Sequence, residues 1–519
     1  MEEILNEKMK SFQVLLDHGK LSFNQHQYDG VRFCIHRELT DVLGIRGGFI
    51  ADEMGLGKTI TTIATIFANY VGNTLIILPP ALLAQWAQEI KRTTGHSAIT
   101  YHGQAKKKIT KEMLEKAPIV LATYNGVQAT TNNPAPSILH QIQWARIVFD
   151  EAHHLRNKTL ILDGVLQLKT TIKWLISGTP IQNSISDYYN LCRVIGISRN
   201  IFMQEENRKV ILSTLVLRRT KKEVGIEIPD MKRTHEIVKW KSPNERSIAE
   251  EIHSVLQFSN VSAEKSNSLS NDFETSGILI TMLRAKQICI LPTLMKEKIQ
   301  RLEKTHIIEP GYTKNLIKST SKMDKVVESL LGKKDNGNGK IVFCHYRREI
   351  DELVMRLKRG GMQNVETIDG RTKKASRQKI LTSNNTHANT HANTHTKTLI
   401  LQIQTGCEGL NLQEEYSEVY FVTPHWNPSV EDQAVARCHR IGQQKEVQVF
   451  RFEMEGFDQC QDQAQCKEDM LDNFDQQLEK RQLEIEDPEE QEFLHTLSMD
   501  SYIMRIQNNK REMLYTMFQ

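Results

Sequence analysis

The chain has 519 residues, of which 39% are hydrophobic and 25% charged, and its formal net charge is +4. This length predicts about two to four domains with apolar cores, and the composition is that of a globular protein. No apolar run approaches the ~18 residues that cross a bilayer, and the charged N-terminus lacks the apolar core of a signal peptide, so we expect an intracellular protein with no membrane partner.

The eight cysteines are scattered along the chain, and none of them forms a C-x-x-C pair. Disulfide frameworks and zinc modules both need closely arranged cysteines, so the pattern indicates a reducing compartment and argues against either arrangement. The cysteines are Cys34, Cys192, Cys289, Cys344, Cys407, Cys438, Cys460 and Cys466.

Charge is distributed unevenly along the chain. Residues 453–500 hold sixteen Asp/Glu and three Lys/Arg, so this segment carries −13 and the remainder of the chain +17. A basic body suits a polyanionic partner. A solvated basic surface without a partner is the alternative, and charge alone does not separate the two.

Short β-branched runs recur along the chain, each followed by turn residues and a helix-like stretch. Nearly continuous apolar strands that alternate with helices indicate parallel sheets covered on both faces. Two such series predict two α/β lobes. The first series is 74–78, 118–124, 145–153 and 173–180, and the second is 340–346, 398–404, 418–424 and 447–452.

The strongest local signal is IADEMGLGKT at residues 50–59, between an apolar stretch and a helical pattern. Gly55 and Gly57 allow backbone N–H groups to close around phosphate oxygens. Lys58 would place a cation on the β- and γ-phosphates, and the Thr59 hydroxyl would ligate Mg²⁺. The segment therefore predicts a phosphate-binding loop.

The sequence DEAH at residues 150–153 ends the predicted strand ARIVF. Carboxylates at the carboxyl end of a parallel strand lie where open α/β sheets bind ligands. We expect Asp150 to hold Mg²⁺ and Glu151 to orient the attacking water. A polar turn at the end of a strand is the alternative, and the phosphate loop upstream in the same lobe disfavours it.

Three segments of the chain carry weaker signals. Residues 185–325 read mostly as helix. Residues 383–397 repeat a Thr-His-Ala-Asn unit, which cannot bury apolar area and predicts a disordered surface loop. A metal site on His387, His391 and His395 is the alternative reading of that repeat, and it offers no carboxylate or thiol partner. The acidic, Gln-rich residues 453–498 form either a loop or a charged helix.

Arg437 and Arg440 lie three positions apart, so on a helix they would share one face. Both would reach a γ-phosphate bound to the first lobe if the two lobes close on each other. Solvated surface arginines are the alternative, and their position within HRIGQ favours a catalytic role.

Together these segments resemble the Swi/Snf-related ATPases of helicase superfamily two, which are DEAH-type motors. Wording such as WNPSVEDQA and GQQKEV leans toward the branch of lodestar-type transcription termination factors and ubiquitin-ligase translocases, here without a RING module. The matching segments are QHQYDGVRF (25–33), IADEMGLGKT (50–59), LIILPPALLAQWAQEI (75–90), DEAHHLRN (150–157), SGTPIQN (177–183), LRRTKKEV (217–224), GCEGLNL (406–412), HWNPSVEDQAVARCHRIGQQKEVQVFRF (425–452) and SYIMRIQNNKREML (501–514).

The resemblance implies an ATP- and Mg²⁺-dependent site shared by two RecA-like lobes, with Gln27 reading adenine. Lys58, Glu151, Arg437 and Arg440 would be catalytic, and Thr59 and Asp150 would hold Mg²⁺. One departure is Asp52, which stands where the strict phosphate-loop pattern has glycine. The implied nucleotide-binding residues are Gln27, Asp52, Gly55, Leu56, Gly57, Lys58, Thr59, Asp150, Glu151, Gly409, Arg437 and Arg440.

The predicted fold is α/β, with two RecA-like parallel-sheet lobes, helical insertions between them and a C-terminal brace helix. The predicted divisions are a leader (1–20), lobe one with a helical extension (21–235), a helical insertion and linker (236–325), lobe two (326–452), an acidic insertion (453–499) and the brace helix (500–519).

The resemblance further implies a DNA-dependent ATPase that translocates on duplex DNA and remodels or displaces bound proteins without separating strands. Its expected partners are duplex DNA and DNA-bound transcription or chromatin proteins. We expect a monomeric motor in a nucleus or viral replication compartment, or otherwise in the cytoplasm. The alternatives are a strand-separating DNA or RNA helicase and a non-catalytic DNA-binding scaffold.

Overall fold

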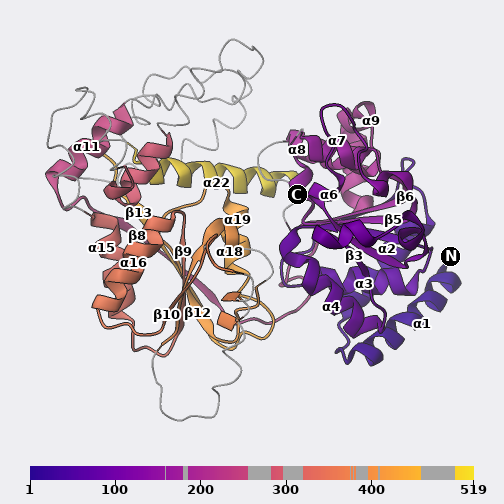
Figure 1. Cartoon of the computed structure of the whole chain (residues 1–519), viewed down its shortest axis with the longest axis horizontal. Coiled ribbons are helices and arrows are strands. Elements are labelled where there is room, and N and C mark those ends of the chain that lie inside the picture. The colour runs from indigo at the N-terminus through magenta and orange to yellow at the C-terminus, as the bar shows by residue number, and fades with distance from the viewer. Residues whose placement is uncertain are drawn as a thin grey trace.

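Two lobes, each built on one parallel sheet, make up the computed structural model (Figure 1). The predicted α/β architecture with two parallel-sheet lobes is confirmed. The structure describes residues 1–157, 159–178, 185–254, 282–295, 320–373, 376–377, 379–380, 396–406, 410–457 and 497–518. The Thr-His-Ala-Asn repeat and most of the acidic segment lie outside these residues, so the predictions made for them stay predictions.

The sheet of lobe one has seven strands in the order β3-β4-β2-β5-β6-β1-β7, and all neighbours are parallel. The strand predicted at residues 74–78 has the same first and last residues as β2. The strands are β1 (Arg46–Ile50), β2 (Thr74–Leu78), β3 (Ile99–Tyr101), β4 (Ile119–Thr123), β5 (Gln143–Asp150), β6 (Lys169–Ile176) and β7 (Val216–Leu217).

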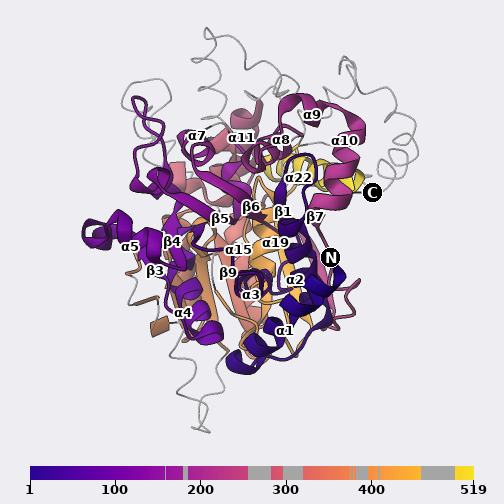
Figure 2. The ribbon, with the colours of Figure 1, turned by 90° about the vertical axis from the view of Figure 1, so that its right-hand side faces the viewer.

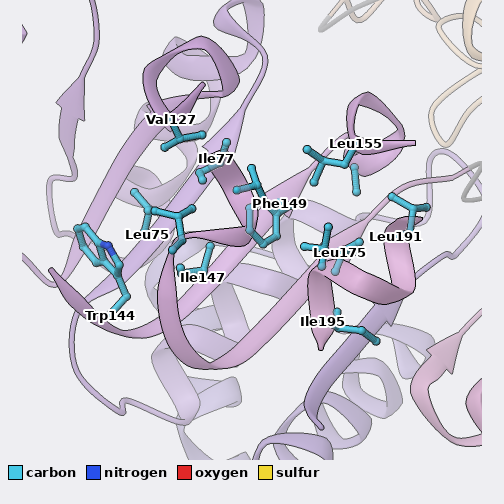
Figure 3. Close-up of a cluster of buried hydrophobic side chains, with 14 of the residues drawn as sticks. Leu75, Ile77, Val127, Trp144, Ile147, Phe149, Leu155, Leu175, Leu191 and Ile195 are labelled. Carbon is cyan, nitrogen blue, oxygen red and sulfur yellow. The ribbon is translucent and has the colours of Figure 1, made fainter. Parts of the chain in front are cut away.

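Both faces of this sheet are buried, as continuous apolar strands require. Along β5, Ile147 and Phe149 join one hydrophobic cluster, whereas Val148 joins the cluster on the opposite face. Figure 3 shows the first of these clusters, in which Phe149 lies among side chains from neighbouring strands and from the helix of Leu191.

Helices cover the two faces of this sheet. They are α1 (Glu2–Gly19), α2 (Gln25–Leu39), α3 (Lys58–Ala68), α4 (Leu83–Thr94), α5 (Lys111–Lys116), α6 (Tyr124–Val127), α7 (Leu160–Leu166), α8 (Ile185–Ile195), α9 (Arg199–Met203) and α10 (Glu205–Val210). Residues 1–20, predicted as a leader, form α1, which packs on α3 and α4 through Leu5, Met9 and Phe12. The leader is thus part of the lobe's core.

The sheet of lobe two has six strands in the order β10-β11-β9-β12-β13-β8, again all parallel. The strands are β8 (Met231–Val238), β9 (Gly339–Cys344), β10 (Val365–Ile368), β11 (Thr398–Gln402), β12 (Tyr416–Phe421) and β13 (Val447–Met454). Its helices are α11 (Pro243–Ser254), α15 (Ser321–Gly332), α16 (Arg347–Arg359), α18 (Ile403–Gly406), α19 (Pro428–Val435) and α22 (Met499–Phe518).

The chain passes directly from one sheet to the other between Leu217, the end of β7, and Met231, the start of β8. We call residues 218–230 the crossing segment. The predicted boundary at residues 235–236 falls inside β8, which is an edge strand of lobe two. Five successive polar residues (232–236) stand in the middle of β8, so it lacks the continuous apolar run that predicts a buried strand.

The final helix, α22, begins in the core of lobe two, where the buried Asp500 carboxylate accepts hydrogen bonds from Lys322, Thr423 and the Met454 N–H. From there α22 extends toward lobe one (Figure 1). Burial, followed by the charge of Arg156, lowers the pKa of Lys510 on this helix, and the charge of Asp187 opposes that shift. Figure 2 views the molecule from the side of lobe one. Within the described part of the chain, no helix is both long and apolar enough to span a membrane.

Candidate active site

The predicted phosphate loop connects β1 to α3 at the carboxyl end of the sheet of lobe one. Gly55 (φ +96°) and Gly57 (φ +78°) adopt left-handed backbone conformations, which glycine tolerates without strain. Leu56 between them is buried and anchors the loop. Lys58 begins α3, so the loop presents the N-terminus of a helix, where backbone N–H groups are available to an anion.

The Lys58 side chain extends from the start of α3 back to the loop, where its ammonium donates to the carbonyls of Asp52 (2.7 Å) and Glu53 (3.2 Å). Burial lowers the pKa of Lys58, and the carboxylates of Glu151, Asp52 and Asp150 oppose that shift. Thr59 follows it, half-buried in the first turn of α3. The cation is thus held in a site with three acidic groups around it.

Asp52 does not face the phosphate side of the loop. Its buried carboxylate forms a two-pronged ion pair with Arg219, at 3.1 Å from Nε to Oδ1 and 2.6 Å from Nη2 to Oδ2. Arg219 also donates to the main-chain carbonyl of His26 (2.6 Å). The departure from glycine at position 52 therefore ties the phosphate loop to the crossing segment and to α2.

Gln27 lies over the phosphate loop on the first turn of α2. A Cβ added at Gly57 would lie 2.3 Å from the side-chain nitrogen of Gln27, so the end of that side chain reaches the phosphate loop. The neighbouring His26 ring nitrogen contacts the Leu56 carbonyl (3.1 Å). The predicted adenine-reading segment thus touches the loop itself.

Asp150 is the last residue of β5, as predicted, and its two carboxylate oxygens have different partners. Oδ2 accepts from the indole N–H of Trp86 on α4 (2.7 Å), and Oδ1 accepts from the Glu151 N–H (3.0 Å). The Asp150 carbonyl accepts from the Tyr124 hydroxyl (2.7 Å). Burial, followed by the charge of Glu151, raises the pKa of Asp150, and the Trp86 hydrogen bond opposes that rise.

Glu151 occupies a left-handed backbone conformation (φ +50°), which is uncommon for a residue with a Cβ and found most often at functional turns. Burial opposes its ionisation, but the His153 hydrogen bond and the cations Lys58 and Arg437 outweigh burial and lower the pKa of Glu151. The side chain is therefore an ionised acceptor at neutral pH, close to Lys58.

The donor set fits ATP with Mg²⁺. A loop with two glycines and an adjacent lysine suits a polyphosphate, and a hydroxyl with a carboxylate is the oxygen chemistry that Mg²⁺ prefers when phosphates complete its shell. Within the described residues, no three His, Cys, Asp or Glu side chains form a cluster that could hold a metal ion alone.

The segment of lobe two that contains Arg437 and Arg440 lies beside the phosphate loop of lobe one. A Cβ at Gly55 would lie 3.5 Å from the Arg440 Cβ, and Arg437 contributes to the electrostatic environment of both Lys58 and Glu151. Burial, followed by the charge of Arg437, lowers the pKa of Arg440, whose guanidinium donates to Asn411.

The expected helical face for these arginines is wrong. Helix α19 ends at Val435, and Arg437 and Arg440 lie in the turns that follow it. Hydrogen bonds from the Arg437 N–H to Ala434 (3.2 Å) and from the Arg440 N–H to Cys438 (3.1 Å) shape these turns. We call residues 436–440 the arginine turn. Gly409 and residues 179–184, both in predicted motifs, lie outside the described residues.

Three contacting residues were missed from the sequence: Trp86, Arg219 and Lys221. Each acts across a long sequence separation, and none belongs to a short motif whose chemistry names its partner. The segments of the resemblance include all three residues, Trp86 in 75–90 and Arg219 and Lys221 in 217–224, but they do not reveal these contacts.

Comparison with known families assigns both lobes. Residues 26–294 match the SNF2-related domain, and residues 321–442 match the helicase conserved C-terminal domain. The first of these matches alone covers more than half of the chain.

Curated relatives include the probable global transactivator of Orgyia pseudotsugata multicapsid polyhedrosis virus, which is 28% identical over 82% of this chain and 85% of its own length. Human chromodomain-helicase-DNA-binding protein 7 is 28% identical over 87% of this chain but only 16% of its own length. Arabidopsis thaliana DNA repair protein RAD5B is 27% identical over 78% of this chain and 43% of its own length.

Among solved structures, the Sulfolobus solfataricus SWI2/SNF2 ATPase core in complex with dsDNA is 25% identical, with a TM-score of 0.38. The match covers 84% of this chain and 89% of that one.

Proposed function

This chain belongs to the SNF2-related family of ATPases, and on that premise we propose that it uses ATP hydrolysis to move along duplex DNA without separating the strands. The observation that carries the proposal is the position of the arginine turn. Arg440 of lobe two lies against Gly55 of the phosphate loop, so a nucleotide on lobe one would also contact lobe two.

In the proposed mechanism, the loop at Gly55 and Gly57 holds the phosphates and Lys58 neutralises the β- and γ-oxygens. Gln27 packs against the loop from the adenine side. Thr59 and Asp150 would hold Mg²⁺, which supplies charge stabilisation on the phosphates. Phosphoryl transfer needs mainly positioning and charge stabilisation, which these groups supply.

The ionised Glu151 carboxylate orients the attacking water and accepts its proton as the water oxygen bonds to the γ-phosphorus. The bond from the γ-phosphorus to the β–γ bridging oxygen breaks in the same step, and ADP leaves with that oxygen. Arg437 and Arg440 stabilise the charge that develops on the γ-phosphoryl oxygens. Hydrolysis removes the group that these arginines bind, so the lobes can reopen and step along the DNA backbone. We also propose a nucleotide contact for Gly409, which the sequence predicts to be part of lobe two.

We extend the proposal to partners and place. The relatives include a probable viral transactivator, chromodomain-helicase-DNA-binding proteins and a DNA repair protein. By analogy, we propose that this motor displaces or remodels transcription or chromatin proteins on DNA, as a monomer, in a nucleus or viral replication compartment. The motif wording supports the branch of the lodestar-type termination factors.

The test is ATP turnover measured in parallel with no nucleic acid, single-stranded DNA, duplex DNA and RNA. Duplex DNA should stimulate turnover most, and the effect should weaken steeply with salt because phosphate contacts release counterions. Displacement of a third strand from a triplex, without unwinding of a forked duplex, should accompany it. Efficient fork unwinding would instead support a strand-separating helicase.

A folded Lys58→Ala variant is the control for both assays. It removes the one cation of the phosphate loop, so turnover should fall to background. Turnover near that of the wild type in this variant would remove the nucleotide-site proposal. DNA binding with no ATP turnover in the wild type would favour the scaffold alternative.

A further inference from the structure

The crossing segment does more than join the two sheets, because it contacts the phosphate loop and the arginine turn at once. Arg219 pairs with Asp52 of the loop. Further along, the Pro229 carbonyl accepts from the His439 ring N–H of the arginine turn (3.0 Å). Lys221 lies between these two contacts and is the residue that reaches both lobes.

On the lobe-one side, Lys221 is bound twice by Glu53. Its main-chain N–H donates to one Glu53 carboxylate oxygen (2.8 Å), and its ammonium lies 3.2 Å from the other. The Lys221 side chain is only 9% exposed, whereas Glu53 is 42% exposed. Glu53 in turn belongs to the phosphate loop, where its carbonyl accepts from Lys58.

On the lobe-two side, the same ammonium donates to the main-chain carbonyl of His439 (3.0 Å). His439 stands directly before Arg440 and two positions after Arg437. A Cβ at Gly55 would lie 3.3 Å from the Lys221 Cε and 3.5 Å from the Arg440 Cβ, so both side chains approach the loop at one point.

We propose that Lys221 is a positioning residue that sets the distance between the phosphate loop and the arginine turn, and so delivers Arg437 and Arg440 to the γ-phosphate. This inference rests on the proposed function. A lysine suits the task, because one ammonium with three donors bridges a carboxylate of one lobe and a carbonyl of the other. Lys221 acts through the arginines and does not itself bind nucleotide.

The experiment compares Lys221→Met with the wild type, and Lys222→Met is the matched control. Lys222 is the next residue, carries the same charge and is exposed, so its loss should change nothing. Lys221→Met should leave the affinity for ATP unchanged and lower kcat by about 10–100-fold, since misplacement by about 1 Å can cost ~10²-fold in rate. Lys221→Arg should restore part of the loss.

The distinguishing measurement repeats Lys221→Met in a background that carries both Arg437→Ala and Arg440→Ala. If Lys221 acts only by placing the two arginines, the residual rate should not fall further in that background. A full multiplicative loss there would overturn the proposal, because Lys221 would then act independently of both arginines. Weakened ATP affinity would overturn it too, by making Lys221 a nucleotide ligand. Unchanged kcat in Lys221→Met would mean that the bridge is not needed.

A readout without turnover separates this inference from the proposed function. Spin labels on exposed residues of each lobe, at Tyr70→Cys and Lys358→Cys, report the distance between lobes with a non-hydrolysable ATP analogue bound. Lys221→Met should broaden that distance distribution, and Lys222→Met should not. An identical distribution in both variants contradicts the positioning role. Absence of DNA stimulation in the wild type contradicts only the proposed function, because the labels and basal turnover still report on Lys221.

Discussion

The hydrogen bond from Trp86 to Asp150 gives a sharp test of how lobe one prepares the Mg²⁺ site. Trp86→Phe keeps an aromatic ring in the core but removes the indole N–H that donates to Oδ2 over 2.7 Å. Among the described residues, the Glu151 N–H is then the remaining donor to the Asp150 carboxylate. The carboxylate loses both an orienting contact and part of the stabilisation of its charge.

The size of the effect follows from the chemistry of that contact. A hydrogen bond to a charged group is worth about 1.5–3 kcal/mol, and each ~1.4 kcal/mol changes an equilibrium tenfold. Loss of an outer partner of a metal ligand typically costs about 10–100-fold in metal affinity or activity. We therefore expect the Mg²⁺ concentration for half-maximal ATP turnover to rise by about 10–100-fold in Trp86→Phe, with recovery at high Mg²⁺.

Trp144→Phe is the matched control for this measurement. Trp144 is as buried as Trp86 and lies near the amino end of β5, the strand that ends at Asp150. Its indole N–H donates to the Leu139 carbonyl (2.9 Å). Its loss should cost comparable stability without moving the Mg²⁺ dependence. An unchanged Mg²⁺ dependence in a folded Trp86→Phe protein, or an equal shift in the control, would refute the reasoning.

Three further perturbations test other parts of the structure. Arg440→Ala should lower DNA-stimulated turnover by about 10³–10⁵-fold with ATP binding retained. Arg440→Lys should not restore turnover, because a lysine ammonium does not reproduce the planar, forked guanidinium. Lost ATP binding with normal turnover per bound ATP would mean that the arginine is structural. Glu38→Ala leaves the buried Arg146 without its carboxylate, so urea denaturation should show about 3–5 kcal/mol lost, whereas a loss below 1 kcal/mol, as expected at the exposed Glu2, would mean that the pair adds little. Burial lowers the pKa of His253 to about 4, so the unfolded chain binds its proton first as the pH falls below ~6.5, and stability should drop by about 2 kcal/mol between pH 7.5 and 5; the same slope in His253→Gln would exclude this histidine as the cause.

Apolar pattern was enough to predict the strands that form the cores. The run at 74–78 matched β2 at both ends because every residue of that strand is buried between two helical layers. The apolar runs do not predict β1, which contains two glycines, or the polar edge strand β8. They also do not predict β3, β7 and β10, which span only two to four residues. The place where the chain changes sheets therefore could not be read from periodicity.

The site divided in a similar way. Residues whose chemistry is fixed by a short motif, such as Lys58 and Asp150, were placed on the loop and at the strand end where the structure has them. The partner of Asp52 was not predictable, because Arg219 is 167 positions away and only the fold brings the two together. The sequence could not separate a helix from a turn at Arg437 and Arg440, because two residues three positions apart can lie on one side of either.

The contacts of the crossing segment differ in strength, and from this difference we infer where the segment bends when the two lobes separate. Arg219 is bound to a carboxylate that is only 2% exposed, and loss of one partner from such a buried pair costs about 3–5 kcal/mol. Lys221 is bound to a partly exposed carboxylate and a carbonyl, contacts worth about 1 kcal/mol each.

When the lobes separate, the hydrogen bond from Lys221 to His439 should break first, while Arg219 keeps its end of the crossing segment on lobe one. The hinge then lies between Lys221 and the start of β8 at Met231. Arg219→Gln should accordingly lower the stability of the protein by about 3–5 kcal/mol in urea. Lys221→Met should lower turnover with a loss of stability of only about 2 kcal/mol, because it removes the two contacts of the ammonium. The reverse pairing, with a stable Arg219→Gln and a strongly destabilised Lys221→Met, would place the hinge before Arg219.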